Sequence, residues 1–113
     1  MTLPSYYDLR NENSYHLMLL GLCQTIKGEY KISSNKENGL GRADIILESQ
    51  TEKPSYVIEL KYSKEKDKLQ QLAKEAIEQI MRSHYDHEIK GEVIYIGIAH
   101  CGKEINVQWK EKI

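Results

Sequence analysis

The sequence contains no Phe, only two Cys and two Pro among 113 residues, and no excess of charge of either sign. Eight Tyr take over much of the aromatic role that Phe usually fills. Cys23 and Cys101 are far apart in the chain, which excludes a zinc motif and a disulfide framework. Cys23 lies in an apolar stretch and is predicted to be a small core residue. The cysteine usage therefore indicates a reducing, cytoplasmic compartment.

The charge balance restricts the kinds of nucleic-acid protein that the chain can be. Its formal net charge is -1, with 29% charged and 40% hydrophobic residues. A protein that coats nucleic acid is normally basic, because neutralising phosphates supplies most of the non-specific affinity. The balance argues against a tight, stand-alone DNA-binding protein. It leaves open an enzyme that contacts DNA locally, since the carboxylates of its own site lower the net charge.

Long apolar segments are also missing from the N-terminal part of the chain. It has no basic region followed by an apolar one, so no signal peptide is predicted. Its longest apolar run, Leu17–Cys23, is far shorter than the roughly 20 residues that a membrane helix needs. The length fits one compact domain, residues 1–113, and the composition indicates neither disorder nor a coiled-coil rod. We therefore expect a single soluble domain without a membrane segment.

Hydrophobic periodicity predicts a mixture of helices and strands. Helices are expected over Asn11–Ile26 and Lys66–His87, and the second carries an apolar stripe from Leu69 to Met81. Strands are expected at Glu29–Ser33, Arg42–Glu48, Tyr56–Tyr62, Glu92–Ala99 and Glu104–Trp109. Residues 34–41 are rich in turn formers and are expected to form a loop. The first three strands should form an antiparallel meander, and the long helix should bring the fourth in parallel through a right-handed connection.

Two of the predicted strands place charged residues at positions that can meet. Side chains alternate across a strand, so Glu59 and Lys61 share one face of the third strand. If the second and third strands form a hairpin, pairing Asp44 with Glu59 centres the turn in the polar segment between them, residues 49–55. The register needs no adjustment, although a bulge would shift it by one residue. The hairpin would bring two carboxylates and one ammonium group together.

This grouping suits phosphodiester hydrolysis. Two carboxylates at close range repel each other unless a cation lies between them. Oxygen ligands without His or Cys suit Mg²⁺ or Mn²⁺, which polarises a phosphate and makes water more acidic. Lys61 would position that water or neutralise charge on the phosphate. A solvated sheet face with cross-strand ion pairs is the alternative. The otherwise apolar strand around Glu59 and the glycine-rich segment before Asp44 favour the site.

A longer set of motifs surrounds these residues. Its parts are Glu12-x-x-Tyr15-His16, Ser34-Asn35-Lys36-Glu37-x-Gly39-x-Gly41-Arg42-x-Asp44, Ile58-Glu59-x-Lys61, Gln79-Ile80 and Gly97-Ile98-Ala99. The set resembles the PD-(D/E)XK nuclease superfamily and, more narrowly, the domain at the C-terminus of predicted AAA-ATPase-like bacterial proteins. The resemblance covers Glu12 to about Val107, and the run before Asp44 is its most specific part. It implies an α/β fold with a restriction-endonuclease-like α-β-β-β-α-β core, in which helices flank a central mixed sheet.

The resemblance also implies an activity and roles for particular residues. The activity is metal-dependent phosphodiester hydrolysis of nucleic acid, and by analogy we expect the substrate to be DNA rather than RNA. Asp44, Glu59 and Glu12 resemble the ligands of Mg²⁺ or Mn²⁺, and Lys61 resembles the catalytic lysine. Gln79 resembles the helix residue that completes the catalytic set from the side.

The sequence departs from the relatives at two points. They carry an ATPase domain upstream, whereas this chain has no glycine-rich Walker loop. We therefore expect either part of a longer protein or a stand-alone domain. After the Gly-Ile-Ala motif the relatives tend to have an aromatic residue, and this chain has His100, which we expect to be structural.

Several assignments stay open on the sequence alone. Arg42 would contact a phosphate, or else form an ion pair with Glu37 or Glu48. Trp109 is expected to pack in the core or at its edge rather than stack on bases. The alternative function is a non-catalytic interaction or nucleic-acid-binding module of an ATPase-linked assembly. The fifth strand would offer an edge for pairing in a homodimer.

Overall fold

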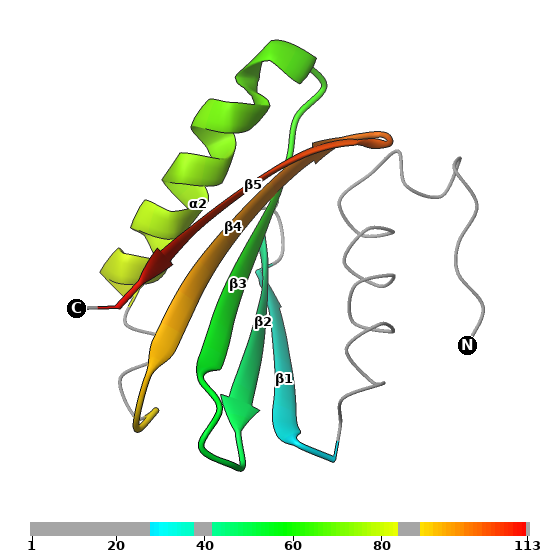
Figure 1. The fold of residues 1–113 in the computed structure, drawn as a ribbon. Coiled ribbons are helices and arrows are strands. Elements are labelled where there is room, and N and C mark those ends of the chain that lie inside the picture. The colour runs from blue at the N-terminus through cyan, green and yellow to red at the C-terminus, as the bar shows by residue number, and fades with distance from the viewer. Residues whose placement is uncertain (1–27, 38–41, 84–88, 113) are drawn as a thin grey trace.

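The computed structural model describes residues 28–37, 42–83 and 89–112, which Figure 1 shows in colour. The described elements are, in chain order, strands β1 (Tyr30–Glu37), β2 (Arg42–Ser49) and β3 (Ser55–Tyr62), the 3₁₀ helix η3 (Lys66–Lys68), helix α2 (Leu69–Ser83), and strands β4 (Val93–Cys101) and β5 (Glu104–Glu111). The helix that we predicted over Asn11–Ile26 lies outside the described residues.

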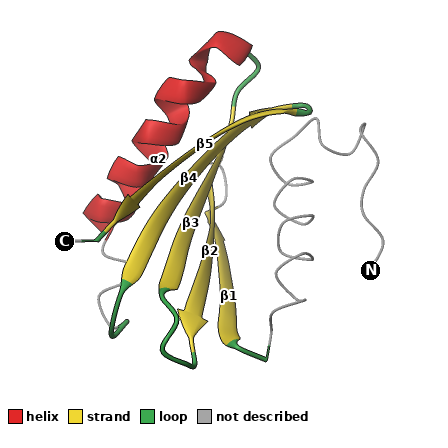
Figure 2. Cartoon of the chain, in the orientation of Figure 1, coloured by secondary structure: helices red, strands yellow, loops and turns green. Residues whose placement is uncertain are grey.

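The five described strands form one sheet in the order β1-β2-β3-β4-β5. Neighbouring strands are antiparallel except for β3 and β4, which are parallel. Parallel strands need a crossover, and α2 supplies it, packing along β3, β4 and β5 on one side of the sheet (Figures 1 and 2). The predicted meander and parallel return are confirmed. A mixed sheet with a crossover helix is consistent with the restriction-endonuclease-like α/β core.

Among the described residues, two element boundaries differ from the sequence prediction by three residues or more; the predicted end of the long helix at His87 lies outside them. β1 continues through residues 34–37, which we predicted to be a loop. It pairs with β2 over its whole length: Tyr30 lies opposite Ser49 at one end and Glu37 opposite Arg42 at the other. Ladder hydrogen bonds to β2 outweigh the weak strand preference of these polar residues. The α-helix begins at Leu69 rather than Lys66, because the apolar stripe begins there and the preceding Lys-Asp-Lys forms an exposed 3₁₀ turn.

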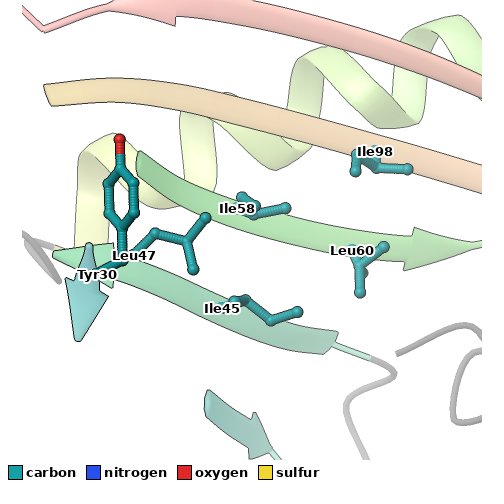
Figure 3. Close-up of a cluster of buried hydrophobic side chains, with 6 residues drawn as sticks. All are labelled: Tyr30, Ile45, Leu47, Ile58, Leu60 and Ile98. Atoms are coloured by element: carbon teal, nitrogen blue, oxygen red, sulfur yellow. The ribbon is translucent and has the colours of Figure 1, made fainter. Parts of the chain in front are cut away.

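Strand alternation gives the sheet two different faces. One carries a cluster of buried apolar side chains and lies away from α2, as Figure 3 shows; we call it the apolar face. Its buried members are Tyr30, Ile45, Leu47, Ile58, Leu60 and Ile98. The other, which we call the helix face, packs against α2. There Val57, Val93 and Tyr95 contact Ile77 and Ile80, and Ala99 packs with Leu69 and Ala73.

Two residues that we expected to pack inward are exposed. Met81 ends the predicted apolar stripe of α2, but 43% of its surface is accessible. Trp109 is 66% exposed on β5, the last strand of the described sheet, so of the two placements that we expected, the core is wrong and the edge remains. Burial is decided by which neighbours cover a face, and periodicity alone does not supply the neighbour. Among the described residues, no helix is long and apolar enough to cross a membrane.

Candidate active site

The β2–β3 hairpin pairs the charged residues as predicted. Asp44 lies directly across from Glu59, and Arg42 across from Lys61, in an antiparallel ladder without a bulge. The connection between the strands is held by the Ser55 hydroxyl, which accepts a hydrogen bond from the backbone N–H of Ser49 at 2.8 Å. The predicted register is therefore confirmed at the level of the backbone.

The third strand directs its two charged side chains toward α2. Glu59 and Lys61 alternate with Ile58 and Leu60 of the apolar face, so they share the helix face with Val57. Their parallel neighbours on β4 are Gly97 and Ala99.

Small residues on β4 allow α2 to lie close beside the charged pair. A Cβ on Gly97 would collide with the carbonyl oxygen of Ala73 and lie 3.0 Å from the Cβ of Ala76. The absence of that Cβ lets the α2 backbone approach β4 beside Glu59. The Gly-Ile-Ala motif is thus a packing requirement for the helix next to the site.

Glu59 is fully buried, whereas Lys61 is only partly so. Burying an ionised carboxylate is costly unless positive charge or hydrogen-bond donors compensate. A hard divalent cation held jointly with Asp44 would provide such compensation, and a set of carboxylate oxygens is what Mg²⁺ and Mn²⁺ prefer. The donor set therefore fits the metal that the sequence suggested.

Lys61 is connected to α2 through Gln79. Its Nζ donates a long hydrogen bond of 3.5 Å to Oε1 of Gln79, and both side chains are partly buried. Sequence resemblance alone had suggested Gln79, since its position in the helix could equally have been exposed. The fold places it beside the lysine ammonium.

Not every predicted site residue is described in full. Glu12 lies outside the described residues, and Asp44 and Arg42 are described by their backbone positions. Within residues 28–37, 42–83 and 89–112, no group of three His, Cys, Asp or Glu side chains that could hold a metal ion is found. Neither Glu12 nor the side chain of Asp44, two of the three carboxylates that we predicted as ligands, is among the groups searched.

His100 lies on the apolar face, on the side of the sheet away from Glu59. It is fully buried, and its ring centroid lies 5.4 Å from that of Tyr62, its parallel neighbour on β3. Burial lowers the pKa of the imidazole to about 4, because the charged form loses its hydration. It therefore fills an aromatic position as a neutral ring.

One of three comparisons with known proteins identifies a family. A family model described as the PD-(D/E)XK nuclease superfamily matches residues 10–110. The chain belongs to this superfamily. Searches of curated proteins and of solved structures gave no match. PD-(D/E)XK nucleases generally use divalent metal ions and act on nucleic acid. The acid, acid and lysine after which the superfamily is named are the residue types that we predicted for the site at Asp44, Glu59 and Lys61.

Proposed function

We propose that this PD-(D/E)XK protein hydrolyses phosphodiester bonds of DNA with the help of Mg²⁺ or Mn²⁺, in the cytoplasm. The observation that carries the proposal is the hairpin register. It sets Asp44 opposite Glu59, with Lys61 two residues further along the same face and next to Gln79. Glu12 is proposed as a third carboxylate of the site.

Asp44, Glu59 and Glu12 would hold the metal. When bound, the cation supplies electrophilic activation of the phosphate and acidifies water for attack. The deep burial of Glu59 keeps its carboxylate in a low-dielectric environment, where attraction to a cation is strong.

Lys61 and Arg42 would act on the substrate. The Lys61 ammonium carries three N–H donors, so after donating to Gln79 it retains donors for a phosphate oxygen or an attacking water. Gln79 would restrict where the long lysine side chain points, which makes it a positioning residue. Arg42, across the ladder from Lys61, would grip a second phosphate oxygen.

A cleavage assay tests the activity. Supercoiled plasmid and single-stranded DNA are incubated with the protein and Mg²⁺, and then with EDTA. We expect cleavage that requires the metal and that falls at least about 100-fold in Lys61→Ala, the usual cost of losing a positioned proton or charge donor. Lys53→Ala is the matched control, because Lys53 is an exposed lysine at the opposite end of the same hairpin. Equal residual cleavage by the Lys61→Ala and unsubstituted proteins would refute the assignment of Lys61.

Metal binding tests the site independently of cleavage. Calorimetric titration with Mn²⁺ should give saturable binding that Glu59→Gln abolishes, since the amide keeps the shape but loses the charge. The metal should also raise the melting temperature of the unsubstituted protein and leave that of Glu59→Gln unchanged. DNA binding without metal binding or cleavage would favour the alternative, a non-catalytic module.

An ATPase partner would belong to the same proposal. The motif resemblance to ATPase-linked domains suggests that longer relatives couple this domain to ATP hydrolysis. Adding such a relative's ATPase domain in trans, with ATP, should change the cleavage rate of this chain if the two work together. An unchanged rate would argue for a domain that acts alone.

A further inference from the structure

Strand β5 is an open edge in the described part of the sheet. It pairs with β4 alone among the described strands, and most of its residues are exposed. Ile105, Val107 and Trp109 are 48%, 47% and 66% exposed, which is unusual for large apolar side chains on one strand. Edge strands with exposed apolar residues are templates for pairing with another strand.

The backbone groups of the same three residues point to the open side. The N–H of Lys112 donates to the carbonyl of Val93 at 3.0 Å, at the end of the β4–β5 ladder. Alternate residues of an antiparallel strand bond to the same neighbour, so the even-numbered residues of β5 face β4. The N–H and C=O groups of Ile105, Val107 and Trp109 therefore face away from β4, on the side where no described strand lies.

We propose that β5 pairs antiparallel with β5 of a second copy of this chain, with Val107 opposite Val107 on a two-fold axis. In that register Ile105 faces Trp109, Asn106 faces Gln108 and Glu104 faces Lys110, and Glu111 comes opposite Lys103 of the β4–β5 turn. Apolar residues meet apolar ones, amides meet amides, and every charge meets its opposite, as favourable cross-strand pairs require. The strand is complementary to itself, which is what a two-fold interface demands.

Neighbouring registers lack this match. The outward backbone groups belong to odd-numbered residues, so the axis must pass through a residue position rather than between two. Moving it to position 106 sets Trp109 against Lys103, and moving it to position 108 sets Ile105 against Glu111. The register centred on Val107 joins the two sheets into one continuous sheet. This interface does not depend on the nuclease assignment.

Cysteine cross-linking tests the register. Ile105→Cys, Val107→Cys and Trp109→Cys are made singly and oxidised gently, and the parent chain gives the background from Cys23 and Cys101. Residue 107 of one copy faces residue 107 of the other at a Cα separation of about 5.5 Å, which a disulfide can bridge. Positions 105 and 109 lie four residues from their own copies, about 13 Å away. Only Val107→Cys should form dimers alone, whereas Ile105→Cys and Trp109→Cys should cross-link when mixed. Equal cross-linking at all three positions, or none above background at 107, would overturn the proposal.

Charge reversal tests the pairing in solution. Sedimentation should give about twice the 13.2 kDa of one chain. Glu104→Lys or Lys110→Glu, each creating two like-charge contacts, should weaken the dimer about tenfold, and the double variant should restore it. Lys66→Ala is the control, because it removes the intrachain ion pair of Glu104, 3.2 Å long, and leaves the interface intact. The fluorescence of Trp109, the single Trp, should shift to shorter wavelength on association. A monomer at all concentrations, or a double variant that dimerises no more tightly than the single variants, would contradict the proposed pairing.

Discussion

The two faces of strand β3 are built for different tasks. Toward the apolar face it presents Ile58 and Leu60, 6% and 0% exposed, in a cluster without a charged member. Toward α2 it presents Glu59 and Lys61, in the strand interior. Because a strand alternates its side chains, Ile58 and Leu60 pack in a core on one side, and their neighbours Glu59 and Lys61 form part of a candidate active site on the other.

The difference shows where the stability of the fold comes from. Each apolar side chain buried away from α2 contributes roughly 1.5–3 kcal/mol relative to exposure. The helix face has less of this apolar burial, because a carboxylate, Glu59, is buried there. Close packing of α2 on Gly97 through Ala73 and Ala76 stabilises this face instead. The comparison leads to three expectations for stability.

The largest effect is expected on the apolar face. Leu60→Ala should lower the free energy of unfolding by about 2–5 kcal/mol, because it removes a fully buried side chain and leaves a cavity. Met81→Ala, on the exposed rim of α2, should cost within about 0.5 kcal/mol. Urea titration of both variants measures the difference. Similar losses for the two would mean that the apolar face is not the main source of stability.

A pH-dependent effect is expected at His100. Its pKa is about 4 in the folded chain and 6.5 when exposed, so below pH 6.5 the unfolded state takes up a proton that the folded state refuses. The stability gained by burying His100 as a neutral ring is fully present above pH 6.5. It declines as the pH falls and is lost below pH 4. The total loss approaches about 3 kcal/mol.

His100→Phe separates this loss from other acid effects. Phe cannot be protonated and keeps a ring beside Tyr62, so the decline between pH 6.5 and pH 4 should be shallower than in the unsubstituted protein. Urea unfolding at four or five pH values measures it. Parallel curves for the two proteins would show that His100 is not buried as a neutral ring.

A smaller effect is expected where α2 meets the sheet. Gly97→Ala should destabilise the protein by about 1–3 kcal/mol, because the new methyl group meets backbone that must move. Gly28→Ala has open space around it and serves as the control. If α2 shifts in Gly97→Ala, the affinity for the metal should fall together with the stability, because Gln79 of α2 then holds Lys61 less well. Loss of stability with unchanged metal binding would separate the packing role of Gly97 from the site.

Sequence patterns predicted much of this architecture. All five described strands, their antiparallel meander and the parallel return after α2 were predicted, as was the pairing of Asp44 with Glu59. These features follow from period-two and helical spacing and from the length of a polar turn, all of which are local. The extension of β1 through residues 34–37 was missed because an aligned partner strand overrode a local turn preference.

The sequence by itself determined the alternation of β3, the hairpin register and the spacing of Glu59 and Lys61, because these depend on neighbours along one or two strands. The tertiary structure decided that Gln79 contacts Lys61, that His100 is a buried neutral ring, and that Trp109 stands on an edge strand of the described sheet. Each of these depends on which element covers which face, and that is settled only when helix and sheet pack together.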